Sequence, residues 1–291
     1  MNDCHRRKSG RYRPRTGNCR PDDPRPRRHG GLRRRRSGPS GRGCDRPCLV
    51  YEPGRAEELA RIAVEDTGLG NVKSKIIKNQ RKTFGCLRDL MRVKTVGVIE
   101  ENKAKGLIKY AKPVGVVGAV SPSPAGMKTT TMTVDYMRAE LKKVGAPEDL
   151  VQVLPAPVDK ALTQALMKAV DLVVITGSQN NVRRGYSSGT PCIGVGAGNV
   201  PVIIDDTADF KDAAEKIRMS KIFDNSTSCS SENSVVILDS VYDEAIAALK
   251  SVGAYVCTAE EKAKVKDTLW KDGHLNRRVI AKDPDIFAKE A

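Results

Sequence analysis

The chain has 291 residues, of which 39% are hydrophobic, and its formal net charge is +16. Residues 1–50 hold 16 Lys and Arg against 4 Asp and Glu, so this head carries +12 and the other 241 residues only about +4. The folded part is therefore not expected to bind nucleic acid. The chain has neither an apolar run of about 20 residues nor an apolar N-terminal stretch, so no membrane span and no secretory signal are expected.

The head, residues 1–50, does not resemble a folding sequence. It is rich in Arg, Pro and Gly, and its few large apolar residues cannot offset the entropy lost on ordering. We expect it to be disordered. Three interpretations are open: a basic arm for nucleic acid, a transit peptide, or an out-of-frame translation of a GC-rich gene. Scarce aromatic residues weigh against the first, and abundant Pro and Gly against the second, so we favour the third.

Two helices are predicted next, the first from residue 52 to a stop at Gly68 and the second over residues 72–90. The Lys and Arg residues of the second helix are interpreted as a solvated face. Two strands joined by a polar turn are predicted at 96–99 and 106–110. The apolar run 114–120 lacks alternation, which indicates a strand buried on both faces of a parallel sheet.

Strands and helices then alternate, as in an α/β domain with a parallel sheet. We predict helices at 131–144 and 160–169 and strands at 150–154 and 172–175. A glycine-rich segment at 189–199 precedes a strand at 200–204 and a helix at 210–219. The polar segment 224–233 leads into a strand at 234–238, and helices around Ala245 and Glu260 follow.

The cysteines and histidines limit the catalytic choices. The eight cysteines show no disulfide framework, so we expect reduced thiols in a cytoplasmic protein. Cys44 and Cys48 lack a partner pair at zinc-ligand spacing, so we expect no metal site. Beyond the head, His274 is the single histidine. It lies in a polar turn and is expected at the surface, so a hydrolytic triad is not predicted.

Cys229 differs from the other thiols because it lies in a polar, hydroxyl-rich stretch just before a strand. A cysteine in such a loop can be exposed and reactive, so Cys229 is a candidate nucleophile. Cys86, Cys192 and Cys257 are expected to be packing residues, and the neighbours of Cys257 are apolar.

A small-residue turn, Thr176, Gly177 and Ser178, ends one predicted strand and opens a helix. Its backbone amides could meet a phosphate or hold a nicotinamide. The glycines at 194–198 precede a strand, so they are not a dinucleotide fingerprint. They could serve a ligand or only a tight crossing of backbone segments.

Four motifs in order resemble the CoA-acylating branch of the aldehyde dehydrogenase superfamily. They are the segments 112–122, 174–178, 194–201 and 228–233, and the resemblance covers essentially residues 51–291. It implies a Rossmann-type NAD(P)-binding domain at 51–198 and a catalytic domain, incomplete here, at 199–291. The sequences of segments 228–233 and 178–184 are more similar to those of enzymes that act on sulfoacetaldehyde than to those of the acetaldehyde-type enzymes.

The resemblance also implies roles for individual residues. Cys229 matches the catalytic thiol, which would attack a short aldehyde, carry the acyl group as a thioester and pass it to coenzyme A. Thr176, Gly177 and Ser178 match the nicotinamide-side turn. Hydrolytic relatives place a water-activating glutamate at the glycine-rich motif, and the segment 193–198 has no carboxylate. A thiol acceptor is therefore expected in place of water. Arg183 and Arg184 could contact a sulfonate, but we interpret them as solvated helix charges.

Three departures from the family pattern lead us to expect little activity from this chain. In the family, a helix and a strand lie between the two parts of the sequence that segment 121–126 joins directly here. The asparagine that stabilises the oxyanion belongs to this missing part. The head replaces N-terminal helices, and the chain ends within the family's catalytic domain. An intact chain is expected to form a homo-oligomer. Two alternatives remain, an acetaldehyde-type enzyme and, in another class, a basic nucleic-acid-binding protein.

Overall fold

The computed structural model describes residues 53–290, apart from 92 and 123–125. Contacts divide the chain into Met1–Arg36 and Ser37–Ala291, and all described residues belong to the second unit. The predicted disorder of the head therefore lies outside the described residues. Within the described ranges, no helix is long and apolar enough to cross a bilayer.

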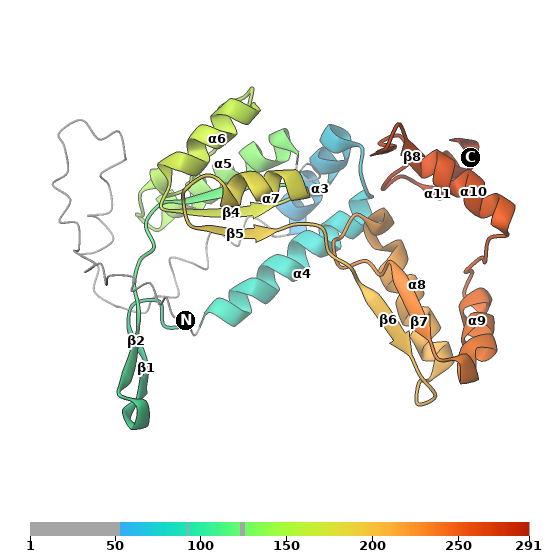
Figure 1. Cartoon of the computed structure of the whole chain (residues 1–291). Helices are drawn as coiled ribbons and strands as arrows, with labels where there is room; N and C mark the ends of the chain where they lie inside the picture. The colour runs from blue at the N-terminus through green and yellow to red at the C-terminus, as the bar shows by residue number, and fades with distance from the viewer. Residues whose placement is uncertain (1–52, 92, 123–125, 291) are drawn as a thin grey trace, which may run out of the picture. The chain divides into compact units, whose positions relative to one another are not determined.

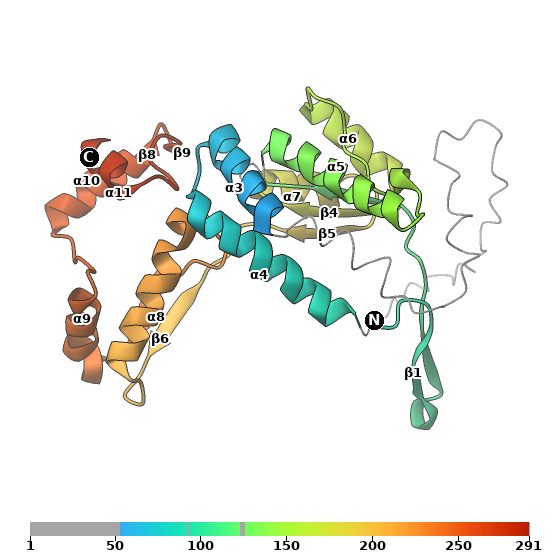
Figure 2. The same cartoon turned by 180° about the vertical axis from the view of Figure 1, so that it is seen from behind.

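The two predicted N-terminal helices are present as α3 (Pro53–Thr67) and α4 (Val72–Leu90). The buried face of α3 consists of residues spaced three or four apart: Ala56, Leu59, Ala60 and Ala63. Asn71 caps α4 because its side chain accepts a hydrogen bond from the Ser74 amide at 2.8 Å. α3 packs against α4 and also against α5 (Met127–Lys143), a contact seen from behind in Figure 2.

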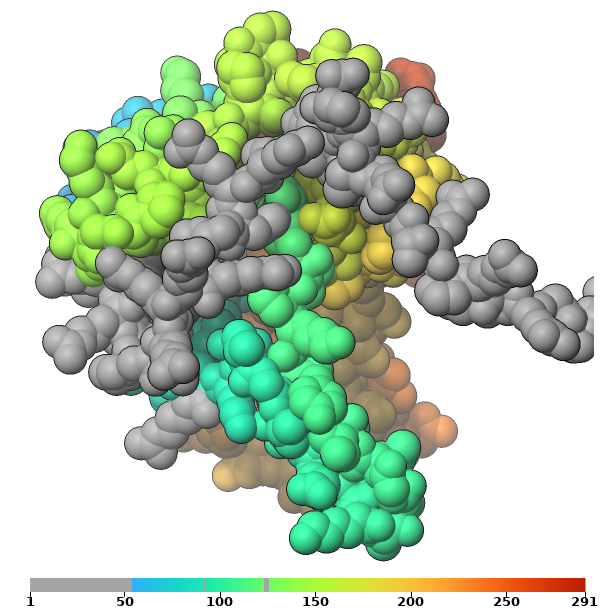
Figure 3. Space-filling model, turned by 90° about the vertical axis from the view of Figure 1, so that its left-hand side faces the viewer, coloured from blue at the N-terminus to red at the C-terminus, as the bar shows by residue number. Residues whose placement is uncertain are grey.

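A β-hairpin follows α4, as predicted. It consists of β1 (Gly97–Asn102) and β2 (Leu107–Ala111), joined by the short helix η2 (Lys103–Lys105). Gly106 ends η2 in the left-handed region with φ 62°, where a glycine has no steric penalty. The hairpin carries exposed apolar side chains, including those of Leu107 and Tyr110, and its teal and green atoms are visible at the surface in Figure 3.

A parallel sheet with strand order β3-β4-β5 confirms the predicted α/β fold (Figure 1). Its strands are β3 (Val117–Val120), β4 (Leu172–Thr176) and β5 (Cys192–Val195). The helices α6 (Lys160–Ala169) and α7 (Gln179–Tyr186) cover one face. A small core forms there from residues of both helices and the central strand, namely Met167, Val173, Ile175 and Val182.

Three predictions for this region need correction. Segment 114–120 is not buried on both faces, since β3 lies at a sheet edge and Val117 is exposed. Residues 150–154 do not form a strand, because no described strand lies beside them to complete a ladder. Only the short helix η4 (Glu148–Leu150) occurs there. Conversely, β5 was not predicted, because glycine-rich segments rarely indicate a strand. The helix α5 begins four residues earlier than expected.

Beyond residue 199, β6 (Pro201–Ile204) and β7 (Ser234–Ile237) pair in parallel, and α8 (Phe210–Ile222) lies between them in the chain. α9 (Tyr242–Ser251) packs against α8, and η6 (Asp239–Val241) precedes it. α10 (Ala259–Leu269), the hairpin β8 (Trp270–Lys271) and β9 (His274–Leu275), and α11 (Pro284–Glu290) complete the order. The predicted strands and helices of this region are confirmed, whereas the domain boundary at 198/199 stays a prediction.

Candidate functional site

The carboxyl ends of the three parallel strands share one edge of the sheet, and the predicted nicotinamide turn lies there. Thr176 is the last residue of β4 and pairs with Val195, the last residue of β5. The Gly177 amide donates a hydrogen bond to the Val195 carbonyl at 3.1 Å, so the turn stays close to the neighbouring strand. Ser178 caps α7, and its hydroxyl accepts from the Asn181 amide at 3.3 Å. This edge is where ligands bind in open parallel sheets.

The start of α7 fits an anionic ligand such as a nucleotide. The helix N-terminus points from the sheet edge, and its first amides carry partial positive charge. Ser178 is exposed, so the entrance is not closed by side chains of the described residues. Arg183 and Arg184 lie in the last turn of the helix and are exposed, in agreement with solvated charges.

The glycines of segment 194–198 serve close packing at two positions. A Cβ atom on Gly194 would lie 2.7 Å from the Val182 side chain and 3.0 Å from the Tyr186 ring. On Gly196 it would lie 2.5 Å from the Gln179 side chain. The strand β5 can therefore approach α7 this closely only with glycine at position 194, whereas the flexible end of the Gln179 side chain could move away from a Cβ atom at position 196. Gly198 has open space around it, so packing does not explain that glycine.

Cys229 lies in the cysteine loop, defined here as residues 227–233, which connects the helix η5 (Phe223–Ser226) to β7. Its side chain is exposed, as predicted. The Ser231 amide donates to the Ser228 carbonyl at 3.0 Å, so Cys229 occupies a tight turn. The end of the loop is held to the residue just before β6, because Asn233 and Val200 exchange two hydrogen bonds of 3.1 Å. The buried Ser231 Oγ and Glu232 Oε2 have no hydrogen-bond partner among the described residues.

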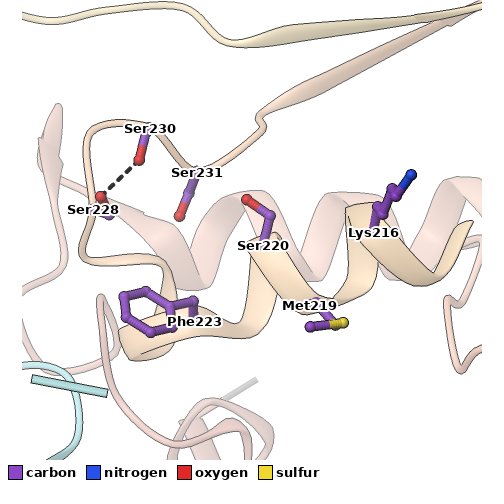
Figure 4. A pocket seen from close by; sticks show the side chains of 7 residues that line it. All are labelled: Lys216, Met219, Ser220, Phe223, Ser228, Ser230 and Ser231. Atoms are coloured by element: carbon purple, nitrogen blue, oxygen red, sulfur yellow. Dashed lines mark hydrogen bonds between the residues drawn. The ribbon is translucent and has the colours of Figure 1, made fainter. Parts of the chain in front are cut away.

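A hollow of about 290 Å³ lies beside the cysteine loop (Figure 4). Its lining comes from α8, η5 and the loop, namely Lys216, Met219, Ser220, Phe223, Ser228, Ser230 and Ser231. The hydroxyls of Ser228 and Ser230 are joined by a hydrogen bond of 2.9 Å. These two serines flank Cys229, which is not itself a lining residue. The volume is near the lower end for small-molecule sites, so the hollow could hold only a small ligand.

The backbone leading into the cysteine loop has an uncommon conformation. Asp224, Asn225 and Ser226 all have positive φ, at 51°, 51° and 58°. Asp224 is fully buried, and its carboxylate accepts from the Lys75 and Lys78 ammonium groups at 3.1 and 3.0 Å. Burial, followed by the neighbouring charge of Lys78, lowers the pKa of Lys75, while Asp224 opposes this shift. Sequence reasoning missed this cluster, and its interpretation of the α4 cations as a solvated face is wrong for Lys75.

The burial of the other three cysteine side chains agrees only in part with the prediction. Cys192 packs against the core of the sheet, as expected, and burial raises the pKa of its thiol. Cys86 and Cys257 are exposed, so their predicted packing role is wrong. The apolar neighbours of Cys257 misled the prediction because Tyr255 and Val256 are themselves exposed. His274 is exposed in the β8–β9 hairpin, as predicted.

The two predicted parts of the site lie on different sheets. The turn of Thr176, Gly177 and Ser178 ends a strand of the β3-β4-β5 sheet, whereas Cys229 precedes a strand of the β6-β7 pair. No hydrogen bond or salt bridge among the described residues joins the turn to the cysteine loop. Each part is therefore built and held by its own neighbours.

Comparison with known proteins places this sequence beside aldehyde dehydrogenases. Residues 123–263 match the aldehyde dehydrogenase family. A sulfoacetaldehyde dehydrogenase (acylating) from Cupriavidus necator is 48% identical over 252 residues, which cover 78% of this chain and 51% of that protein. The chain thus spans about half the length of the curated relatives it matches.

Solved structures show the same likeness. The chain is similar to an acetylating aldehyde dehydrogenase from Geobacillus thermoglucosidasius, with 32% identity and a TM-score of 0.79 over 86% of this chain and 61% of that one. It is also similar to an engineered glycolyl-CoA reductase with bound NADP⁺, at 25% identity and a TM-score of 0.71 over 86% of this chain and 64% of that one. Residues 123–263 thus match the aldehyde dehydrogenase family, and the chain resembles CoA-acylating members of that family.

Proposed function

We propose that this chain carries the chemistry of a CoA-acylating aldehyde dehydrogenase, with Cys229 as the residue that holds the acyl group. The observation that carries this proposal is the exposed thiol of Cys229 in a hydroxyl-lined turn beside a small hollow. It is supported by the likeness of the chain to acylating relatives at 32% to 48% identity.

The proposed reaction has two halves, and both pass through Cys229. Its thiolate adds to the carbonyl carbon of the aldehyde, and loss of hydride from that carbon leaves an acyl thioester on the sulfur. The thiol of coenzyme A then attacks the thioester carbonyl, and the Cys229 thiolate leaves. Aldehyde, coenzyme A and NAD(P)⁺ are thereby converted into acyl-CoA, NAD(P)H and a proton.

When bound, NAD(P)⁺ supplies the hydride acceptor. Thr176, Gly177 and Ser178 are the residues that would hold it, because they form the sheet edge and the start of α7 that fit an anionic ligand. Bound NADP⁺ in the similar glycolyl-CoA reductase supports a pyridine nucleotide here.

Coenzyme A is proposed as the acyl acceptor in place of water. Gly194 and Gly196 lie in close contact with α7, and segment 193–198 offers no carboxylate that could take a proton from water. An acyl-CoA product and a pyridine nucleotide are handled in the cytoplasm, which we propose as the location. The proposed partners are a short aldehyde and coenzyme A, with assembly into a homo-oligomer.

We propose sulfoacetaldehyde as the aldehyde, because the relative from Cupriavidus necator carries that name. Lys216 borders the hollow, but its ammonium is held by Asp212 at 2.5 Å and points away from the loop serines in Figure 4. It is therefore not assigned to the sulfonate. Acetaldehyde is the alternative substrate, supported by the likeness to the acetylating enzyme.

The direct test is the reverse of the second half-reaction, in which an acyl-CoA transfers its acyl group to Cys229. The purified chain is incubated with sulfoacetyl-CoA or acetyl-CoA, and acyl transfer to the Cys229 peptide is measured by mass spectrometry. We expect acylation of Cys229, faster with sulfoacetyl-CoA, and none on Cys86 or Cys257. An unmodified Cys229 peptide with both thioesters would contradict the proposal. Because segment 121–126 is shorter than the family pattern, we expect slow overall turnover with aldehyde and NAD(P)⁺ even where acyl transfer succeeds.

A further inference from the structure

The Asp224 carboxylate is the most fully enclosed charged group near the cysteine loop. Its two oxygens accept three hydrogen bonds, from the Lys75 and Lys78 ammonium groups and, at 3.0 Å, from the Asn71 amide. The side chain of Asp224 is 0% exposed and that of Lys75 is 3% exposed, so both charges are withdrawn from water. Such a pair is costly to bury and does not by itself stabilise a fold.

The enclosure is shaped around this carboxylate. Gly70 lies directly beside it with φ +71°, and a Cβ atom there would lie 2.0 Å from Asp224 Oδ1 and 2.9 Å from the Lys75 nitrogen. A left-handed backbone and the absence of a side chain are thus both required at Gly70. The N-terminal part of α4, the helix η5 and Gly70 therefore surround the Asp224 carboxylate.

The segment that Asp224 begins is held in a conformation that L-residues avoid. Three consecutive non-glycine residues, 224–226, have positive φ, and such backbone persists only where its surroundings fix it. The surrounding bonds are specific: Asn71 donates to the Asn225 side chain at 3.3 Å, and Asn225 donates to Asp283 at 2.9 Å. The Thr227 amide then donates back to the Asp224 carbonyl at 3.0 Å.

We propose that Asp224, held by Lys75 and Lys78, is a positioning residue that fixes the cysteine loop and thereby sets the direction of the Cys229 thiol. We call Asp224 with its two cations, Lys75 and Lys78, the anchor. This inference rests on the proposed function, because it assigns the anchor a part in acyl transfer. Only five positions separate Asp224 from Cys229, and residues 224–228 determine how the turn around Cys229 leaves η5. The anchor touches neither the thiol nor the hollow, so its effect passes through the backbone.

The anchor joins parts of the chain that are distant in sequence. Lys75 and Lys78 belong to α4, and Asp224 follows them by 149 and 146 positions. The helix α4 thus supports the start of the cysteine loop from outside the β6-β7 sheet. Such support is what a loop nucleophile needs, because a displacement of about 1 Å can cost about 10²-fold in rate.

The test compares Asp224→Asn and Lys78→Gln with the intact chain, using Glu140→Gln as the matched control. Glu140 is likewise buried and paired with two cations, Arg55 of α3 and Lys143 of its own helix α5, but these contacts lie far along the chain from Cys229. Three rates are measured at a temperature where each variant is folded: acylation of Cys229 by acyl-CoA, alkylation of Cys229 by iodoacetamide, and amide hydrogen exchange over 224–233.

We expect Asp224→Asn to slow acylation of Cys229 by at least about tenfold and to speed amide exchange over 224–233. Alkylation by the small reagent iodoacetamide should change less than about twofold, because it needs an exposed thiol and not a fixed direction. Lys78→Gln should give an intermediate loss. Since the Lys78 side chain is 27% exposed, this variant keeps the test open if Asp224→Asn fails to fold. Glu140→Gln should leave all three rates unchanged.

Wild-type acylation and exchange rates in folded Asp224→Asn, or in Lys78→Gln if only that variant folds, would overturn the positioning role. Equal losses in acylation and alkylation would also overturn it, because they would indicate general opening of the loop region. If the intact chain is not acylated at all, the proposed function fails instead. Amide exchange over 224–233 then still decides whether Asp224 holds the loop.

Discussion

The two halves of the candidate site are built in different ways. The turn of Thr176, Gly177 and Ser178 is placed by a regular parallel ladder, with β4 between β3 and β5 and a small apolar core behind it. The cysteine loop is placed by an irregular, left-handed backbone and by buried charges. One half is held by repeating hydrogen bonds and apolar burial, and the other by a few specific polar contacts.

Because of this difference, the two halves should respond differently to amino-acid substitution. A ladder distributes its hydrogen bonds over several residues, so losing one contact shifts it little. The segment that enters the cysteine loop is held around a single carboxylate, that of Asp224, and a buried charge that loses its partner costs far more than an apolar contact. The proposed nucleotide side at Thr176 should therefore tolerate substitution better than the proposed nucleophile side at Cys229.

The largest effect is expected for Cys229→Ala. Removing the sulfur should reduce acyl transfer from acyl-CoA by at least about 10³-fold, since the other exposed thiols, Cys86 and Cys257, lie outside the cysteine loop. Binding of NADP⁺, measured by fluorescence titration, should stay within about twofold, because the turn at Thr176 is held by its own sheet. Cys257→Ala, at another exposed thiol, serves as the control. Loss of NADP⁺ binding in Cys229→Ala would show that the two halves are not independent.

The next largest effect is expected for Gly70→Ala. The added Cβ atom would collide with the Asp224 carboxylate in a backbone that disfavours alanine, so the free energy of unfolding should fall by about 2–4 kcal/mol. Urea denaturation followed by circular dichroism measures this loss. Gly54→Ala in α3 is the control, because open space surrounds it, and it should be neutral or stabilising by up to about 1 kcal/mol. Equal unfolding midpoints for the two variants would contradict the close packing at Gly70.

Prediction from the sequence succeeded where a pattern repeats. Helical spacing of apolar residues located α3, and short apolar runs located β4 and β7. Residue context placed Cys229 in an exposed loop. Periodicity reports which face of an element is buried, and this information is local to about one turn of helix or one strand.

Prediction failed where distant partners decide the outcome. Burial of Lys75 depends on Asp224, 149 positions away, and a lysine in an amphipathic helix gives no sign of such a partner. Likewise, apolar neighbours suggested burial for Cys257, but no described element covers that segment. The strand predicted at 150–154 is absent because strand formation needs a neighbouring strand, which local sequence cannot supply.

A moderate effect on the nucleotide side is expected for Gly194→Ala. Its Cβ atom would press on Val182 and Tyr186 and push α7 from the sheet, so unfolding should become easier by about 1–3 kcal/mol. The start of α7 moves with it, and NADP⁺ binding should weaken more than acylation of Cys229. Gly198→Ala, with open space around it, should change stability by less than about 0.5 kcal/mol. A Gly194→Ala variant that loses acylation but keeps NADP⁺ affinity would reverse the assignment of the two halves.

The smallest effect concerns a second buried carboxylate, Glu140, whose cations are more exposed than those around Asp224. A hydrogen bond from Lys143 lowers the pKa of Glu140, and one from Arg55 adds to this against the opposing effect of burial. A carboxyl with a lowered folded pKa stabilises the fold fully above its unfolded pKa of about 4.3, and that contribution disappears as the pH falls through the folded value. Glu140→Gln should therefore lose about 1 kcal/mol at pH 7, and the gap to the wild type in urea unfolding should close below about pH 4. A gap that stays constant from neutral to acid pH would mean that the charge of Glu140 contributes nothing to the stability of the fold.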